Sequence, residues 1–192
     1  MKKLGTVTLN TPRLTLRRFT ADDAEEMFAS WANDAEVTRF LTWTPHGDVS
    51  VTRAILSDWE NMYADPTYYN WAIVIHGKTD ELIGSIALAN VDEREESGTV
   101  GYCMAKRFWG NGIMTEALSE VLRFAFLEVG FKLIKGQHAA NNIGSSRVME
   151  KCGMQKTGAV LGTTVLPTTG ECVDIIVREI TKRRYAPHAA SE

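Results

Sequence analysis

The stretch Arg107-Phe108-Trp109-Gly110-Asn111-Gly112-Ile113-Met114-Thr115 joins a predicted strand to a long predicted helix. This strand-loop-helix unit is the most informative part of the chain for predicting the fold. Gly110 and Gly112 let the backbone turn tightly and approach a ligand closely, because glycine lacks a Cβ. The first N–H groups of the following helix have no partner inside the helix, and with the helix dipole they form a site suited to a pyrophosphate. The alternative is that the two glycines only shape a tight strand-to-helix turn that binds nothing.

Two common nucleotide-binding loops do not match this stretch. A dinucleotide-binding loop needs a third glycine where Thr115 stands, and it belongs to the first strand-helix-strand unit of a chain, whereas this loop lies past mid-chain. A Walker loop needs a Gly-Lys-Ser/Thr sequence, which is absent here.

Hydrophobic periodicity on both sides of the loop predicts seven strands and four helices. The strands are expected at residues 13–19, 69–75, 82–91, 99–104, 133–138, 154–161 and 171–180, and the helices at 20–31, 51–63, 112–129 and 144–151. Three successive strands followed by a strand-helix-strand unit indicate an α/β (α+β) fold whose mixed sheet has antiparallel and parallel parts.

Composition sets limits on the class of protein. The chain has 192 residues, 44% of them hydrophobic and 23% charged, which fits one domain over 1–185 with a disordered tail at 186–192. A net charge of −3 argues against a nucleic-acid binder. Three scattered cysteines predict no metal site and a reducing, cytoplasmic location. No apolar run is long enough for a membrane span.

A second informative segment lies about thirty residues after the glycine loop and runs from Asn141 to Met154. It reads as a strand end, a loop, a short helix, a glycine cap and another strand. Asn142 and Ser145 would lie near the mouth of the sheet. Both residue types are also good helix caps, and a capping role does not exclude a functional one.

At these two segments the sequence resembles the GCN5-related N-acetyltransferase (GNAT) superfamily, and more narrowly its RimJ/RimL-type branch. Arg107, Gly110 and Gly112 match the Arg/Gln-x-x-Gly-x-Gly/Ala loop, and Asn142-x-x-Ser145-x-Arg147-Val148-x-Glu150-Lys151-x-Gly153 resembles the second motif. The opening strand and Gly101-Tyr102-Cys103-Met104 also resemble the branch. The resemblance covers most of the chain.

This resemblance implies a GNAT-type, mostly antiparallel seven-stranded sheet with a central strand-helix-strand unit. Its fourth and fifth strands, here 99–104 and 133–138, would splay apart around acetyl-CoA as co-substrate. The residues that it implies for the cofactor are Cys103, Met104, Arg107, Trp109, Gly110, Asn111, Gly112, Ile113, Met114, Thr115 and Asn142. The fourth strand would bind the pantetheine arm and polarise the thioester carbonyl, and the loop would hold the pyrophosphate.

The implied reaction is direct attack of a neutral amine on the thioester. Many members of the superfamily protonate the departing thiolate with a tyrosine, but the matching residue here is Met149. The branch is thought to use a serine one turn earlier, which matches Ser145, so Ser145 is assigned to the thiolate. The glutamate that often serves as base is replaced by Thr99.

Asp174, in the last strand, matches an acidic position common in the branch and is the first candidate for the base. The other carboxylates considered are Glu171, Glu95, Glu96 and Asp92. Each of these groups, Asp174 included, also reads as a solvated surface carboxylate, and a water relay without a single base is a further alternative.

The acceptor is expected between the loop after the first helix and the turn before the last strand, where Trp43, Pro45 and His46 would line it. The sequence predicts an N-acetyltransferase acting on a primary amine, either a protein N-terminal α-amine or a small molecule. The alternative is a non-catalytic CoA-binding regulatory domain. A monomer and a homodimer are both compatible with the sequence, and no nucleic-acid or membrane partner is expected.

Overall fold

The computed structural model describes residues 1–77 and 80–185. One sheet holds eight strands in the order β1-β2-β3-β4-β5-β6-β8-β7. The strands are β1 (Leu9–Asn10), β2 (Leu14–Arg17), β3 (Tyr69–Ile75), β4 (Glu81–Asp92), β5 (Ser97–Met104), β6 (Leu133–Ala139), β7 (Gln155–Val165) and β8 (Cys172–Thr181). The α-helices are α1 (Ala24–Met27), α2 (Ala35–Thr38), α3 (Val49–Met62), α4 (Ile113–Arg123) and α5 (Ile143–Lys151).

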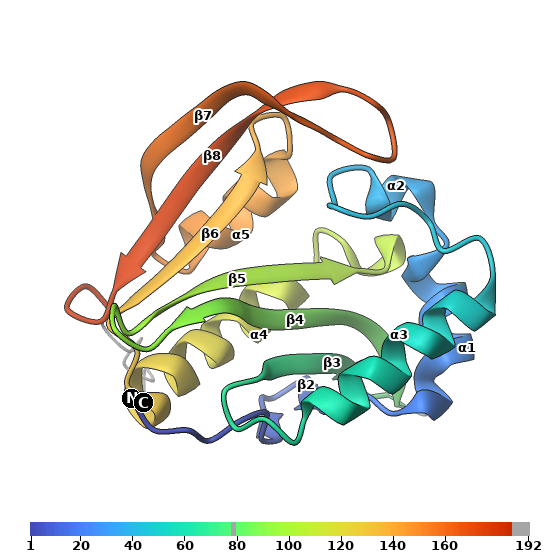
Figure 1. Ribbon diagram of the computed structural model, residues 1–192, viewed down its shortest axis with the longest axis horizontal. Helices are drawn as coiled ribbons and strands as arrows, with labels where there is room; N and C mark the ends of the chain where they lie inside the picture. The colour runs from blue at the N-terminus through green and yellow to red at the C-terminus, as the bar shows by residue number, and fades with distance from the viewer. Residues whose placement is uncertain (78–79, 186–192) are drawn as a thin grey trace.

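The predicted mixed sheet is confirmed. The pairing is antiparallel throughout except for β5 and β6, which run parallel and are joined by α4. The expected count of seven strands is low by one, because the two-residue strand β1 pairs with β2 at its edge. Figure 1 shows α4 and α5 on one face of the sheet and α1 and α3 on the other. The expected tail at 186–192 lies outside the described residues.

Helix α4 covers its face of the sheet with the predicted apolar stripe. The stripe residues Met114, Ala117, Leu118, Val121, Leu122 and Ala125 are all buried. They pack in one core cluster with residues of β3, β4, β5 and β6. At full burial each larger aliphatic side chain contributes about 1.5–3 kcal/mol, so this cluster fixes where α4 begins and therefore where its N–H groups point.

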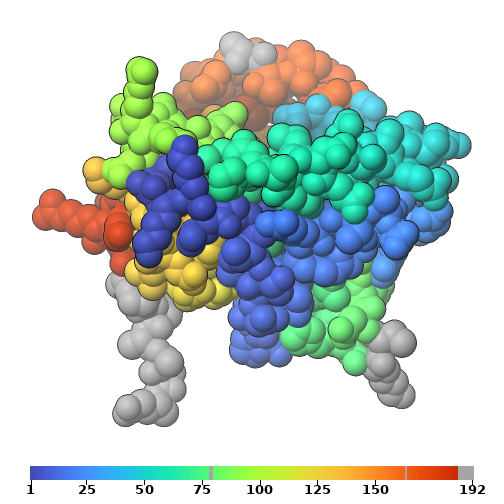
Figure 2. Space-filling view, turned by 60° about the horizontal axis from the view of Figure 1, so that its bottom comes forward, coloured from blue at the N-terminus to red at the C-terminus, as the bar shows by residue number. Residues whose placement is uncertain are grey.

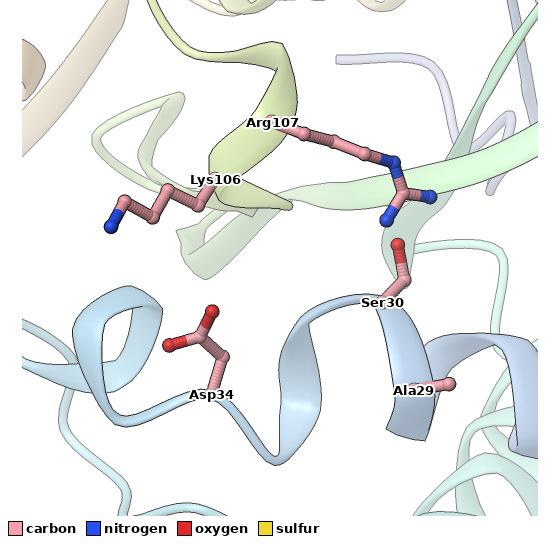
Figure 3. A pocket seen from close by; sticks show the side chains of 5 residues that line it. All are labelled: Ala29, Ser30, Asp34, Lys106 and Arg107. Carbon is pink, nitrogen blue, oxygen red and sulfur yellow. The ribbon is translucent and has the colours of Figure 1, made fainter.

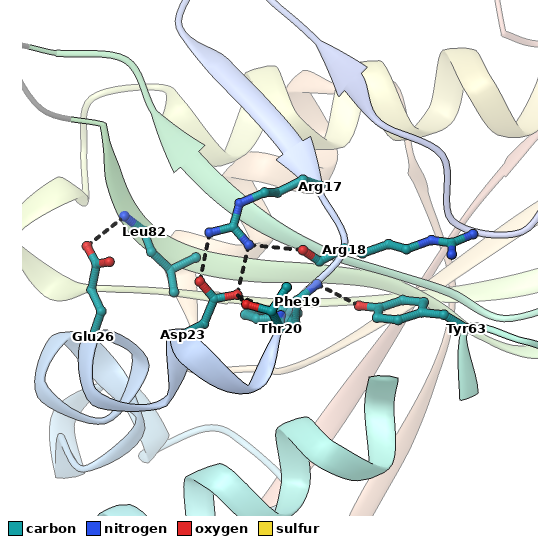
Figure 4. Close-up of polar contacts among 8 residues, drawn as sticks. All are labelled: Arg17, Arg18, Phe19, Thr20, Asp23, Glu26, Tyr63 and Leu82. Atoms are coloured by element: carbon teal, nitrogen blue, oxygen red, sulfur yellow. Dashed lines mark hydrogen bonds and ion pairs between the residues drawn. The ribbon is translucent and has the colours of Figure 1, made fainter. Parts of the chain in front are cut away.

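The opposite face carries α1 and α3, and its polar contacts fix the chain after β2 (Figure 4). Asp23 accepts two hydrogen bonds from the Arg17 guanidinium, at 2.8 and 2.7 Å, and a third from the Thr20 N–H at 2.8 Å. The Phe19 N–H donates to the hydroxyl of Tyr63 at the end of α3. The predicted helix start at Thr20, with acidic residues in the first turn, is confirmed. Figure 2 shows this face, with α3 in teal above the N-terminal residues in blue.

The parallel strands β5 and β6 diverge in the middle, as the resemblance implied. Their pairing ends at Val100 and Gly136, whereas β6 stays paired with β8 along its whole length. Beyond these residues the backbones of β5 and β6 splay apart toward their carboxyl ends, and the opening is this unpaired gap between residues 101–104 and 137–139 (Figure 1).

Packing on α2 holds the β7–β8 hairpin away from β5. Phe40, just after α2, packs on a small cluster made by Ala139, Leu166 and Val173. The Thr168 hydroxyl, in the turn between β7 and β8, donates to the carbonyl oxygen of Thr38 at 3.1 Å and to that of Trp43 at 3.4 Å. The turn between β7 and β8 thus packs on residues 38–43, in the segment after α1.

Candidate functional site

Beyond Val100, the edge of β5 that faces β6 has lost its β6 partners. The Ala105 N–H donates to the Ile83 carbonyl of β4 at 2.8 Å. Backbone groups alternate between the two edges of a strand, so those of Tyr102 and Met104 turn toward the side from which β6 has diverged. This stretch includes the predicted pantetheine-binding residues Cys103 and Met104. Val100, Tyr102 and Met104 share a face and pack on the α4 cluster, and Cys103 packs on the other side.

The glycine loop between β5 and α4 has the geometry of an anion cradle. Gly110 and Gly112 have φ values of 79° and 73°, a region that L-residues with a Cβ rarely adopt. A Cβ added to Gly110 would meet no atom within 4 Å, and one added to Gly112 would meet only Arg13 Nη2, at 3.8 Å. Gly112 is the N-cap of α4 and has no side chain to cap the helix.

The first-turn amides of α4, at the predicted residues Ile113, Met114 and Thr115, therefore follow a glycine turn with open space at both Cβ positions. That arrangement fits the pyrophosphate of acetyl-CoA.

The remaining loop residues hold this backbone in place. The Trp109 indole Nε1 donates to the Met104 carbonyl at 2.8 Å, and the residue as a whole is 47% exposed. The Asn111 side-chain amide donates to the carbonyl oxygens of Phe108 and Trp109, at 3.3 and 3.2 Å. These contacts cross-link the turn internally and hold the loop in one shape.

The two arginines near the loop differ from the sequence expectation. The Arg107 guanidinium, predicted to contact the pyrophosphate, pairs with Glu81 and lies over the Phe108 ring, 5.0 Å from its centroid. It lines an open pocket of about 460 Å³ with Ala29, Ser30, Asp34 and Lys106, and Figure 3 shows its side chain directed toward Ser30. The Arg107 guanidinium is thus engaged with Glu81 on the side of this pocket, and its contact with the pyrophosphate stays a prediction.

Arg13, which was not among the predicted cofactor-binding residues, lies at the loop instead. Its Nη1 donates to the Asn111 carbonyl at 3.1 Å, and its Nε donates to Glu116 Oε2 at 2.6 Å. Burial raises the pKa of Glu116, but hydrogen bonds from Thr11 and Arg13 outweigh it, and the net pKa is lowered. The two contacts join Arg13 to residues 98 and 103 positions away, so no local pattern could have revealed them.

The start of α5 forms the other wall of the opening. Asn142 is the N-cap, and its Oδ1 accepts the Ser145 N–H at 3.1 Å. The Ser145 hydroxyl lies 2.8 Å from the hydroxyl of Tyr102 on β5. The capping role of Asn142 is confirmed, and Ser145 is brought into contact with a residue of the opposite wall.

The carboxylates considered as the base occupy three different places. Asp174 Oδ1 accepts the Gly162 N–H at 2.7 Å across the β7–β8 hairpin, where the β7 register shifts, so Asp174 also has a structural contact. Glu171 faces Arg39 at the surface. Asp92 ends β4, and Glu95 and Glu96 lie in the turn that follows it, so all three are at the end of β5 away from the glycine loop, and this placement argues against them.

A second pocket, of about 430 Å³, lies where the acceptor was expected. It is lined by Thr42, Trp43, Thr44, Pro45, His46, Val51, Ile55 and Pro167. The Trp43 and His46 rings are 5.0 Å apart, and His46 Nδ1 lies 2.8 Å from the Thr52 hydroxyl. Burial lowers the pKa of His46, so the ring is neutral near pH 7.

Over residues 1–77 and 80–185, no helix is both long and apolar enough to cross a bilayer. Across the same part of the chain, no group of His, Cys, Asp and Glu side chains is arranged to hold a metal ion.

Comparison with known proteins agrees with this geometry. A family profile described as "Acetyltransferase (GNAT) domain" matches residues 13–155. The N-acetyltransferase p20 of Bacillus licheniformis is 27% identical over 179 residues, which cover 93% of this chain and 98% of p20. The N-acetyltransferase YoaA of Bacillus subtilis (strain 168) is 30% identical over 152 residues, covering 79% and 85% of the two chains.

Among solved structures, the ribosomal-protein-S5-alanine acetyltransferase of Vibrio fischeri superposes with a TM-score of 0.81 at 17% identity, covering 94% of this chain and all (100%) of that one. This likeness shows a shared fold. The family match runs from the start of β2 into β7 and includes the glycine loop and the α5 segment. The chain therefore belongs to the GNAT family of acetyltransferases, enzymes that take their acetyl group from acetyl-CoA.

Proposed function

We propose that this protein transfers an acetyl group from acetyl-CoA to a primary amine, and that the acceptor is a protein N-terminal α-amine or a small-molecule amine with an apolar body. The observation that carries the proposal is the divergence of β5 from β6 at Val100 and Gly136, directly beside the open amides at the start of α4. The opening offers backbone donors for the thioester and the pantetheine arm, and the loop offers donors for the pyrophosphate.

The proposed roles of the side chains follow from the bonds that change. The amine nitrogen attacks the thioester carbonyl carbon, a C–N bond forms, the C–S bond breaks with its electron pair on sulfur, and the nitrogen loses a proton. Ser145 is the proposed donor to the sulfur, and Asn142 the proposed partner of the pantetheine arm. Asp174 is the proposed acceptor of the amine proton, with a water relay as the alternative route. Holding the two reactants together can alone lower the barrier by about 7–11 kcal/mol.

The acceptor class rests on the lining of the second pocket. Among its described lining residues there is no carboxylate, and His46 is neutral near pH 7. A polyamine would need negative charge there, whereas Trp43, Pro45 and Ile55 suit an apolar or aromatic group. The fold shared with a ribosomal-protein-S5-alanine acetyltransferase makes free peptide N-termini the first acceptors to test.

The test is a two-step measurement on purified full-length protein. Thermal unfolding with acetyl-CoA, ATP and NAD comes first, and only acetyl-CoA should raise the midpoint; at about 100 times its dissociation constant it should add about 2.7 kcal/mol. Release of free CoA thiol is then followed with a panel of peptides, arylalkylamines and polyamines. Turnover with peptides or arylalkylamines supports the proposal. Tight acetyl-CoA binding without turnover on any amine would instead favour a CoA-binding regulatory domain.

A further inference from the structure

Tyr102 crosses the opening between the two walls of the site. It lies on β5, two residues beyond the last β5–β6 pair, and its ring packs on the α4 cluster. Its hydroxyl oxygen lies 2.8 Å from Ser145 Oγ and 3.2 Å from the Ser145 carbonyl oxygen, both at the start of α5. The hydroxyl therefore reaches the one residue of α5 to which the leaving sulfur is assigned.

The partners of Ser145 limit how its hydroxyl can point. The Ser145 N–H is already taken by Asn142 Oδ1, which fixes the backbone at the helix start. Tyr102 has one hydrogen to donate and Ser145 has one. If Tyr102 donates to Ser145 Oγ, the serine hydrogen is left to point out of the pair. If Tyr102 donates to the carbonyl, the serine hydrogen is used up on the tyrosine oxygen.

Neither hydroxyl is suited to give its proton away. Burial raises the pKa of Tyr102 above its ordinary value of 10.0, so the phenol stays neutral at physiological pH. A free thiol has a pKa of about 8.5 and is the stronger acid. The pair can therefore stabilise a thiolate by hydrogen bonding while both protons stay on oxygen.

The neighbouring turn of α5 offers no substitute for this hydroxyl. Met149, one turn after Ser145, is 1% exposed and packs against β6. A Cβ added at Gly136 would lie 2.9 Å from the Met149 Cε, which shows how closely the side chain fills that space. Tyr102 thus brings a polar group to Ser145 from the β5 wall.

We infer that Tyr102 is a positioning residue that acts through Ser145. Its hydroxyl donates to Ser145 Oγ and so directs the serine hydrogen toward the sulfur of the departing CoA. The C–S bond breaks with its electron pair on sulfur, the serine donates a hydrogen bond to that thiolate, and no proton leaves either hydroxyl. This inference rests on the proposed function, because it needs CoA in the opening.

The pKa of the CoA thiol bound to the protein tests the inference without any acceptor. The thiolate is followed by its ultraviolet absorbance as pH is raised, and a parallel titration with desulfo-CoA subtracts the protein's own tyrosines and cysteines. Removing the hydroxyl in Tyr102→Phe should raise the pKa of the bound thiol by about half a unit to one unit, the effect of one hydrogen bond. Ser145→Ala should raise it at least as much.

The double variant decides whether Tyr102 works through the serine. In the Ser145→Ala background, Tyr102→Phe should cause no further shift, because a residue acting through Ser145 has nothing left to orient. An equal shift with and without Ser145, or no shift in Tyr102→Phe, would overturn the inference. Tyr185→Phe is the matched control; its ring packs on Phe126, beyond the C-terminal end of α4, and its loss of hydroxyl should leave the thiol unchanged.

Folding and binding are checked separately. Circular dichroism and thermal unfolding establish that each variant is folded, and Tyr102→Met provides a second way to remove the hydroxyl with different packing. The same shift in both variants supports loss of the hydroxyl as the cause, and a shift in only one of them would contradict it. If the wild-type protein does not bind CoA in calorimetry, the proposed function fails; if it binds CoA and Tyr102→Phe titrates like the wild type, only this inference fails.

Discussion

Replacing Arg13 by Met should weaken acetyl-CoA binding more than the same change at Arg107, although the sequence motif contains only Arg107. The Arg13 guanidinium holds the glycine loop through the Asn111 carbonyl and ties it to α4 through Glu116. One of its nitrogens lies 3.8 Å from where a Cβ of Gly112 would stand, so its charge borders the proposed phosphate site.

The expected size of the effect follows from exposure. The Arg13 side chain is 46% exposed and that of Glu116 18%, so their ion pair contributes little, about 0–1 kcal/mol. The charged hydrogen bond to the Asn111 carbonyl and the attraction of a nearby phosphate add about 1 kcal/mol more. A loss of about 1–2 kcal/mol corresponds to a roughly 5- to 30-fold higher Kd.

Titration calorimetry with acetyl-CoA, at low and at moderate salt, measures this change. Arg107→Met is the matched control and should change Kd less than about twofold, because its guanidinium pairs with Glu81 and borders a different pocket. The wild-type affinity should fall with added salt more steeply than that of the Arg13 variant, since the lost charge is screened. A larger loss in Arg107→Met than in Arg13→Met would refute this reasoning and show that Arg107 leaves Glu81 to reach the phosphates.

Four further outcomes are expected. Gly112→Val should abolish measurable acetyl-CoA binding in a folded protein, because φ of 73° strains a β-branched residue and the side chain would fill the cradle; unaltered calorimetry would count against the loop assignment. Asp174→Asn keeps an oxygen for the Gly162 N–H but cannot accept the amine proton, so its turnover should fall as far as that of Asp174→Ala. Full turnover in Asp174→Asn, with loss in Asp174→Ala, would make Asp174 structural and favour the water relay. Trp43→Ala should raise KM for the acceptor and leave KM for acetyl-CoA unchanged in steady-state kinetics. Burial lowers the pKa of His138 below 6.5, so the unfolded chain takes up the proton first and the free energy of unfolding falls as pH drops below about 6.5; urea unfolding of His138→Gln should show a weaker dependence on pH in that range.

Strands and helices with strong periodicity could be predicted from the sequence. Strand 69–75 has the predicted bounds, because all but one of its residues are buried and the apolar run is uninterrupted. The helix that follows the glycine loop was also found, although its last turns, Phe124–Val129, are π-helical. In both cases local periodicity and tertiary burial indicate the same element.

Irregular elements were predicted less well. Strand β7 was expected to end at 161 and continues to Val165, past a register shift beginning at Val160 that interrupts the alternation. Helix α2 was missed, although Asp34 caps it by accepting the N–H groups of Glu36 and Val37. One turn carries too little periodicity to be recognised, and the capping aspartate was the available indication.

The residues of the candidate site fall into two groups, those that act through the backbone and those that act through a side chain. Gly110, Gly112 and Asn142 act through backbone conformation or a local cap, and such roles depend on neighbours in sequence, so a short motif can reveal them. Arg13 and Tyr102 act through side chains that meet partners 98 and 43 positions away, Asn111 and Ser145 respectively. Their geometry exists only once β2, β5, α4 and α5 have packed, because it is the buried stripe of α4 and the divergence of β6 that place these groups together. The backbone part of an acetyl-CoA site can thus be predicted from a sequence, whereas the side chains that orient its loop and its serine are found only in the structure. The Arg13 and Tyr102 variants therefore test contacts that the sequence motif does not contain.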